Sequence, residues 1–205
     1  MSDPRDRNER FDASSIGAFL AGYRSCLADA LAAVDADALC KAAEAVMAAA
    51  AARARVYAVG NGGSAAIADH LCCDLTKGTD VQGHPPIVSF SLVSNTPLYS
   101  AIANDLEFAE VFARQIDYVC RPGDVLIAVS SSGSSENIVR AARAAKAAGV
   151  TVIGLTGFSG GKLRAIADIA LHVPANNYGV VEDAHQSLMH VIAQWVTARR
   201  LEPVG

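Results

Sequence analysis

Histidines and carboxylates occur at helical spacing in two segments of this chain that lie far apart in the sequence. His70 and Asp74 are four residues apart, so they share one face if their segment is helical. Near the C-terminus, Glu182, Gln186 and His190 are also spaced by four. Two helices that each offer a histidine and a carboxylate can close a tetrahedral zinc-type site. The same groups can also act as acid and base without a metal, and the residues alone leave both chemistries open.

Two loops rich in serine and glycine indicate a phosphate site. Residues 60–64 and 130–135 each follow an apolar segment and each open a helical pattern. Free N–H groups at a helix start attract anions, and hydroxyl donors replace the water around a phosphate. The chain has neither a Walker lysine nor a G-x-G-x-x-G pattern, which argues against nucleoside triphosphates and dinucleotides. We therefore predict a sugar phosphate held by Ser64, Ser130, Ser131, Ser132 and Ser135.

The elements that must position these residues alternate between strand and helix. Apolar runs predict strands over 56–59, 87–91, 125–129 and 151–155, with a weaker one over 170–173. Helical patterns separate them, two Ala-rich helices are predicted over 14–34 and 37–54, and a final helix covers about 180–200. Such alternation predicts an α/β fold with a parallel sheet covered on both faces. The two loops then lie at the carboxyl ends of strands, where ligands bind.

The composition suits one globular domain. At 205 residues, 52% of them apolar, the chain can form a single α/β domain over 14–205, preceded by a charged and mobile segment over 1–13. A net charge of −4 argues against general nucleic-acid binding. No apolar run spans a bilayer and the first residues have no signal-peptide core, so we expect no membrane partner and a cytoplasmic location.

Several residues near the candidate site are expected to be structural. The five cysteines are an odd number without CxxC spacing, so they are interpreted as small buried apolar residues, although Cys72 and Cys73 lie between His70 and Asp74. His84 and His172 have no comparable partners and are also expected to be structural, as is a third Gly-rich turn over 156–162.

Taken together, these residues resemble the sugar isomerase (SIS) domain family, and within it the phosphoheptose isomerase branch. The markers are residues 60–64, His70, residues 103–105, 123–126, 130–133, 155–157 and 160–162, and His190. The similarity extends over nearly the whole chain. It implies a five-stranded parallel SIS-type sheet flanked by helices, with further helices at the N-terminus. It also implies a homotetramer with sites at the subunit interfaces.

The resemblance further implies a site with one zinc ion. Carried onto this chain, the metal ligands are His70, Asp74, Glu182 and His190, and the catalytic residues are Asp74, Glu182 and His190. The substrate-binding set is Asn61, Gly62, Ser64, Asp105, Ser130, Ser131, Ser132 and Ser135. Two positions depart from the family pattern, because Asp74 stands where the family has Glu and Glu182 stands where it has Gln. The shorter Asp74 withdraws its carboxylate by about 1.5 Å, while Glu182 adds a second charge that attracts a divalent cation.

The expected reaction is aldose–ketose isomerisation, converting sedoheptulose 7-phosphate to D-glycero-D-manno-heptose 7-phosphate. A carboxylate removes a proton beside the carbonyl, and His190 moves a proton on the opposite side. Either Asp74 is this base, or Asp74 is only a metal ligand and Glu182 is the base. The alternative function is that of a non-catalytic family member that binds a DnaA-type replication initiator or senses a sugar phosphate.

Overall fold

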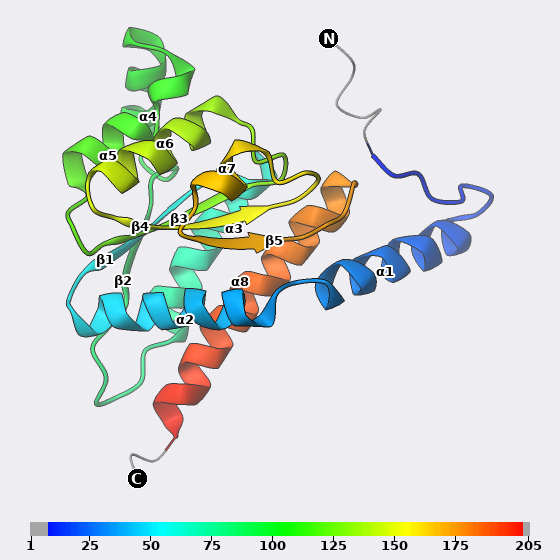
Figure 1. Cartoon of the computed structure of the whole chain (residues 1–205), viewed down its shortest axis with the longest axis horizontal. Helices are drawn as coiled ribbons and strands as arrows, with labels where there is room; N and C mark the ends of the chain where they lie inside the picture. The colour runs from blue at the N-terminus through cyan, green and yellow to red at the C-terminus, as the bar shows by residue number, and fades with distance from the viewer. Residues whose placement is uncertain (1–7, 203–205) are drawn as a thin grey trace.

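The computed structural model describes residues 8–202 and contains a five-stranded parallel sheet flanked by helices (Figure 1). The strands are β1 Arg55–Val59, β2 Val88–Ser91, β3 Val125–Ser130, β4 Thr151–Thr156 and β5 Ile169–His172, in the order β2-β1-β3-β4-β5. The helices are α1 Ile16–Ala32, α2 Ala36–Ala51, α3 Gly63–Cys73, α4 Thr96–Asp105, α5 Ala113–Val119, α6 Glu136–Ala147, α7 Gly161–Ile166 and α8 Tyr178–Leu201. A π-helical turn, Asp74–Gly78, extends α3, and a 3-10 turn covers Phe108–Glu110. The predicted fold class and all five predicted strands are confirmed.

The burial patterns follow from the residue types. All six residues of β3 are buried, as expected for the central strand of a sheet covered on both faces. In α2 the buried residues are Ala42, Ala43, Val46, Ala49 and Ala50, spaced by three and four along one helix face. Alanine on that face allows the helix to approach the sheet closely, so the Ala-rich segment packs as a covering helix.

Two apolar cores lie on opposite faces of the sheet. One is formed by residues of α2, α3 and α8 with alternate residues of the strands. The other is formed by residues of α4, α5, α6 and α7 with the remaining strand residues. In Figure 1, α5, α6 and α7 lie above the sheet, and α2 and α8 lie below it. The fold is therefore three-layered, and α8 lies on the same face as α3, the other helix with candidate site residues.

Helix α1 extends away from the layered body (Figure 1). Of its 17 residues, which are all described, Ala30 alone is buried. Ile16 is 85% exposed and Leu20 is 53% exposed, so α1 presents apolar side chains to solvent in the single chain. No helix within residues 8–202 combines the length and the apolar character needed to cross a membrane.

The segment before α1 contacts the body of the molecule. The backbone N–H of Glu9 donates to the carbonyl of Asn176 at 2.6 Å. The ring of Phe11 packs edge-on against Phe19 and Tyr23, with centroids 5.3 and 5.7 Å apart. Residues 1–7 of the segment that the sequence predicts to be mobile lie outside the described residues.

The strand order creates a switch point between β1 and β3. After β1 the chain crosses to β2 on one side, and after β3 it crosses to β4 on the other. Where the connections after two neighbouring strands lead to opposite sides of the sheet, a crevice forms at the carboxyl ends of those strands. Ligands of α/β proteins bind in such crevices. The loops that follow β1 and β3 are the two Ser/Gly loops of the sequence, so the fold places both at this crevice.

Candidate active site

The loops after β1 and β3 are joined by a pair of side-chain amides. Asn61 Nδ2 donates to Asn137 Oδ1 at 2.9 Å, and Asn137 Nδ2 donates to Asn61 Oδ1 at 2.9 Å. This reciprocal pair links the start of α3 to the first turn of α6, so the two loops keep one relative position. Asn137 is buried and was not among the predicted site residues; its position directly after the serine loop is the one sequence signal that points to it.

A cavity of about 170 Å³ lies between these loops and the start of α8. Its lining residues are Asn61, Ser64, Val129, Ser130, Ser131, Ser132, Ser135, Tyr178 and Glu182. All five serines predicted to bind phosphate are therefore brought together. The Oγ atom of Ser131 is buried and has no hydrogen-bond partner among the described residues. An orphaned hydroxyl in a serine-lined cavity between two helix starts fits an anion such as phosphate.

Gly62 and Asp105 differ in their relation to this cavity. Gly62 caps the start of α3 with φ +56°, a conformation that favours glycine, and it is next in the chain to Asn61 in the cavity wall. Asp105 ends α4, where its Oδ1 accepts from Asn104 Nδ2 at 2.8 Å. Its side chain is exposed and does not line the cavity. Within one chain the structure therefore leaves Asp105 apart from the other predicted substrate-binding residues.

The third Gly-rich turn, which follows β4, packs against the serine loop that follows β3. The N–H of Gly157 donates to the carbonyl of Ser131 at 2.8 Å, and the N–H of Leu163 donates to the carbonyl of Gly133 at 2.9 Å. Gly133 has φ +62°, and a methyl group in place of its hydrogen would collide with the carbonyl oxygen of Gly160. The two loops are thus in backbone contact, which agrees with the structural role predicted for this turn.

The predicted histidine and carboxylate group forms where α3 meets α8. His190 Nδ1 lies 3.0 Å from Asp74 Oδ2, and His70 Nε2 lies 3.5 Å from Asp74 Oδ1. One potential ligand atom from each of these three residues lies within 4.8 Å of the others, the arrangement expected of a metal-binding group. The side chain of His70 is 49% exposed and that of His190 is 38% exposed, so a substrate can reach the group from solvent.

Gln186 lies between the two histidines of this group, although it was not among the predicted site residues. Its Nε2 lies 2.9 Å from His70 Nδ1 and 3.1 Å from His190 Nε2. The sequence signal was its spacing of four from both Glu182 and His190, which places all three on one stripe of α8. Spacing alone does not say which member of the stripe meets α3.

Glu182 does not join the His70–Asp74–His190 group. It lies one turn earlier on α8, where its carboxylate faces Gly63 at the start of α3 and lines the serine cavity. The approach is so close that a methyl group at Gly63 would collide with Oε2 of Glu182, which explains the glycine at that position. Burial raises the pKa of Glu182 above its ordinary value, and the nearby Asp183 raises it further.

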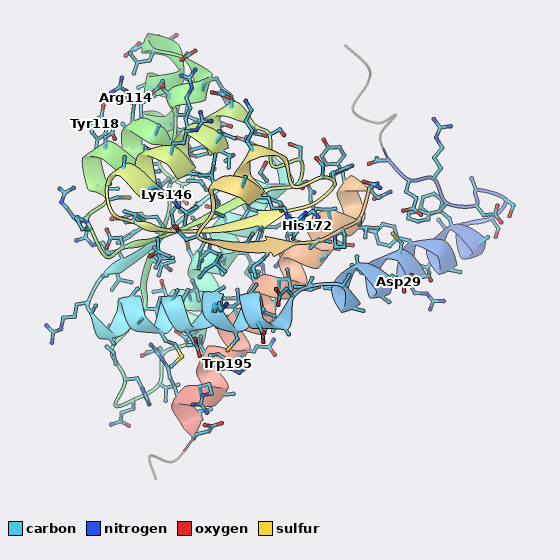
Figure 2. The ribbon with its side chains drawn as sticks, in the orientation of Figure 1. Asp29, Arg114, Tyr118, Lys146, His172 and Trp195 are labelled. Atoms are coloured by element: carbon cyan, nitrogen blue, oxygen red, sulfur yellow. The ribbon has the colours of Figure 1, made fainter. Side chains whose placement is uncertain are left out.

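The other histidines and the cysteines lie around the site. His172, on the edge strand β5 (labelled in Figure 2), pairs its Nδ1 with Thr156 Oγ1 at 3.1 Å, in keeping with a structural role. His185 is completely buried behind the stripe of α8, and neither ring nitrogen has a hydrogen-bond partner among the described residues. Burial lowers the pKa of His185 to about 4, so this ring is neutral at physiological pH. His84 lies in the loop before β2 and does not join the group.

The interpretation of the cysteines as buried residues is correct for two of the five. Cys72 and Cys120 are buried, and burial raises the pKa of each thiol to about 12, so neither is reactive at neutral pH. Cys40 and Cys73 are exposed and Cys26 is half-buried, which corrects that prediction. The reason is that Cys40 and Cys73 fall on the outer faces of α2 and α3, a matter of helix phase rather than residue type.

Comparison with known proteins gives one consistent result. The profile of the SIS domain matches residues 19–157 of this chain. The phosphoheptose isomerase of Mycobacterium bovis (strain BCG / Pasteur 1173P2) is 42% identical over 143 residues, which are 70% of this chain and 72% of the relative. That of Rhodospirillum rubrum is 40% identical over 157 residues, 77% of this chain and 83% of the relative.

Solved structures agree with the sequence comparison. The phosphoheptose isomerase GmhA from Neisseria gonorrhoeae matches with a TM-score of 0.82 at 30% identity, covering 89% of this chain and 97% of that one. A phosphoheptose isomerase from Francisella tularensis matches with a TM-score of 0.83 at 27% identity, covering 89% and 96%. The shared fold therefore extends over most of this chain.

Proposed function

The chain belongs to the SIS domain family and is a sugar-phosphate isomerase of the phosphoheptose isomerase type, and we propose that it interconverts sedoheptulose 7-phosphate and D-glycero-D-manno-heptose 7-phosphate. The observation that carries this proposal is the pairing of two features at one edge of the sheet. A serine-lined cavity with the orphaned Ser131 hydroxyl suits the phosphate. Beside it, on α8, Glu182 and His190 supply groups for proton transfer.

The donor set also fits a divalent metal ion. Two imidazoles and a carboxylate from His70, His190 and Asp74 are ligands that zinc accepts, and one ligand atom of each residue lies within 4.8 Å of the others. When bound, the ion would act as a Lewis acid toward the carbonyl and hydroxyl oxygens of the sugar. We propose zinc in this role, held by His70, Asp74 and His190.

Proton transfer is assigned from the surroundings of the two carboxylates. Both oxygens of Asp74 face histidines, whereas Glu182 lines the cavity that takes the substrate. Its raised pKa suits a base that must also return the proton. In the proposed reaction Glu182 takes a proton from C1 of the ketose to form an enediol and returns it to C2. His190 moves the proton between the two sugar oxygens, which gives the aldose.

Assembly and location are further parts of the proposal. The apolar side chains that α1 exposes in the single chain support a homotetramer in which this helix is covered by neighbouring subunits. Asp105, which is remote from the cavity in one chain, would then be available to a site at a subunit interface. The five cysteines are all free thiols, which supports a reducing, cytoplasmic location.

The test is incubation of the full chain with sedoheptulose 7-phosphate, with added zinc or with a chelator, and detection of the aldoheptose 7-phosphate. Turnover that the chelator abolishes supports both the isomerase and the metal. Turnover that survives complete metal removal supports the isomerase and contradicts the metal. Absence of turnover by folded, zinc-loaded protein contradicts the proposed reaction, and phosphate-dependent binding of the sugar would then support a sensor.

The phosphate cavity is tested separately by a pair of serine variants. Ser131→Ala removes the orphaned hydroxyl, and we expect KM for the sugar phosphate to rise about 10-fold or more, because a hydrogen bond to a charged group is lost. Ser134→Ala is the matched control, since Ser134 lies in the same loop but does not line the cavity. An unchanged KM for Ser131→Ala, measured by steady-state kinetics, would contradict the phosphate assignment.

A further inference from the structure

The backbone changes from α-helix to π-helix at Asp74, the first residue of the π-helical turn Asp74–Gly78. The N–H of Thr79 donates to the carbonyl of Asp74 at 3.1 Å, which lies five residues earlier and not four. Such turns are rare and are found frequently at functional sites. Because the turn begins at Asp74, the contacts that hold it bear on the direction of the Asp74 carboxylate.

The C-terminal end of α8 bonds to the backbone at the end of this turn. Arg200 Nη1 donates to the carbonyl of Thr79 at 2.7 Å, and Arg200 Nη2 donates to the carbonyl of Pro85 at 2.9 Å. Thr197 Oγ1 lies 3.1 Å from the carbonyl oxygen of Gly78, and it also contacts a carbonyl of its own helix at 2.9 Å. Two side chains of α8 therefore hold three carbonyls at and after the end of the π-helical turn.

Strand β2 bonds to the same segment near its start. The buried Ser89 donates from Oγ to the carbonyl of Cys72 at 2.9 Å, and Ser89 Oγ lies 2.7 Å from Thr76 Oγ1. Since a serine hydroxyl has one proton, Thr76 is the donor in the second contact. Asp74 lies between Cys72 and Thr76 in the chain, so the segment is held on both sides of it.

Arg200 is an unusual residue for this position, because it is a buried cation. Its exposed fraction is 5%, and both of its recorded contacts among residues 8–202 are with backbone carbonyls rather than carboxylates. Burial lowers the pKa of Arg200, and the charge of Asp80 offsets this only in part. A buried cation without an ion pair destabilises a fold, and an apolar side chain fills such a space without that loss. What Arg200 offers instead is its planar fork, which reaches two carbonyls at once.

We infer that Arg200 and Thr197 are positioning residues, which hold the π-helical turn so that Asp74 faces the histidines of the site. Asp74 Oδ2 lies 3.0 Å from His190 Nδ1, and Oδ1 lies 3.5 Å from His70 Nε2. Helix α8 thus supplies both His190 and the contacts that direct Asp74 toward it. The importance of this alignment for turnover rests on the proposed isomerase, whereas the alignment itself is measurable without substrate or metal.

Two variants of α8 remove these contacts, and two others serve as controls. Arg200→Met removes the fork and keeps an unbranched side chain, and Thr197→Val removes one hydroxyl group. Thr197→Ser keeps the hydroxyl and should behave as wild type. Arg199→Met is the matched control for the arginine, because the neighbouring Arg199 is 50% exposed and pairs with Glu202 instead of the π-helical turn.

The direct readout is the set of ring ¹⁵N chemical shifts of His190 in metal-free protein in mildly alkaline solution, which show which ring nitrogen carries the proton. The hydrogen bond to a carboxylate favours the proton on the nitrogen that faces it. We therefore expect the proton on Nδ1, facing Asp74, in wild type, Arg199→Met and Thr197→Ser. In Arg200→Met and Thr197→Val the Nδ1–H signature should be lost as Asp74 turns away.

Steady-state kinetics with sedoheptulose 7-phosphate and added zinc give the second readout. Arg200→Met should lower kcat about 10-fold or more, with KM within about 2-fold of wild type. The reason for the unchanged KM is that neither Arg200 nor Thr197 lines the serine cavity. A merely structural role would lower the free energy of unfolding and leave both the ring shifts and the kcat of folded protein unchanged.

Unchanged ring shifts in folded Arg200→Met and Thr197→Val overturn the inference, and so does an equal change in Arg199→Met. If circular dichroism shows that Arg200→Met does not fold, the comparison of Thr197→Val with Thr197→Ser decides the question. Absence of turnover by wild-type protein contradicts the proposed isomerase, but the ring shifts still test the positioning of Asp74. Wild-type turnover with unchanged ring shifts in the variants leaves the isomerase standing while this inference fails.

Discussion

At the scale of single residues, the two carboxylates on either side of the histidines lie in different surroundings. Asp74 begins the π-helical turn that extends α3 and directs both oxygens at imidazole rings, 3.0 Å from His190 and 3.5 Å from His70. Glu182 is half-buried beside the serine loop, and its raised pKa has burial as its main cause. In the proposed mechanism, Asp74 therefore holds the cation and Glu182 exchanges a proton with the substrate.

Glu182→Gln should lower kcat by about 100-fold or more, because general base catalysis contributes at least that factor. The pH profile gives a second readout. A base must be deprotonated, so wild-type kcat should fall as pH falls through the raised pKa of Glu182, above the ordinary carboxyl range. In Glu182→Gln that acid limb should disappear. Retention of full activity, or an unchanged acid limb, would assign the base to another residue.

Asp74→Asn keeps the size of the side chain and removes its charge. If Asp74 is only a metal ligand, we expect zinc affinity to fall about 10- to 100-fold and activity to recover when zinc is added to saturation. If Asp74 is instead the base, activity should stay low at saturating zinc. Titration of activity against free zinc therefore decides between the two versions of the mechanism that the sequence left open.

At the scale of elements, the serine loop depends on the turn beneath it. The loop after β3 and the turn after β4 are held in contact by backbone hydrogen bonds from Gly157 and Leu163. Their closest approach is at Gly133, where no side chain fits. The positions of the serines proposed to bind phosphate therefore depend on the packing of two loops and not on the serine loop alone.

Gly133→Ala should destabilise the protein by about 2 kcal/mol or more, because it combines a strained left-handed backbone with a collision against Gly160. Gly83→Ala is the matched control: Gly83 has φ +92° but nothing lies within 4 Å of the added methyl group. Gly83→Ala should lower the free energy of unfolding by only the backbone strain, about 1 kcal/mol. Urea denaturation of both variants measures the difference, and equal losses would contradict the proposed loop contact.

At the scale of the whole molecule, α8 connects the site to the core. Buried residues recur along it from Val180 to Val196, and its opposite stripe carries the site residues. Trp195, on α8, packs against the core that residues of α2 also form, and it lies below α2 in Figure 2. His185 is the exception on the buried face, since both of its ring nitrogens lie in the interior without hydrogen-bond partners among residues 8–202.

His185 should make the stability of the protein dependent on acid pH. The pKa of His185 is about 4 in the folded state, below the ordinary histidine value of 6.5, so the folded protein binds the proton less well. Stability from the neutral ring is present above pH 6.5 and is lost as pH falls from about 6.5 toward 4. At pH 4.5 the loss should be about 2 kcal/mol. His185→Leu removes this contribution.

The measurement is the free energy of unfolding in urea at pH 7 and pH 4.5 for wild type and His185→Leu. Other titrating groups act alike in both proteins, so the difference between the two pH dependences isolates His185. Parallel losses of stability in the two proteins would contradict the prediction. The variant should fold, because removing an orphaned polar group from the interior carries no hydrogen-bond cost.

Local sequence patterns determine the strands, the Ser/Gly loops and part of the candidate site of this protein. Five apolar runs at strand length predicted the five strands, and the placement of the Ser/Gly loops after two of them predicted the serine cavity. The four-residue spacing of His70 and Asp74 predicted that they share one face, and the structure places them 3.5 Å apart on α3 and the π-helical turn that continues it. These features depend only on neighbours along the chain, so the sequence by itself determines them.

The tertiary structure alone decided which residue of the α8 stripe meets α3. Glu182, Gln186 and His190 have the same spacing, but the crossing of the two helices brings Gln186 and His190 to His70 and leaves Glu182 at the serine cavity. It likewise buried His185 and kept Asp105 away from the cavity. The physical reason is that helical periodicity sets a direction around an axis, whereas the contact made at each turn depends on where another helix crosses that axis.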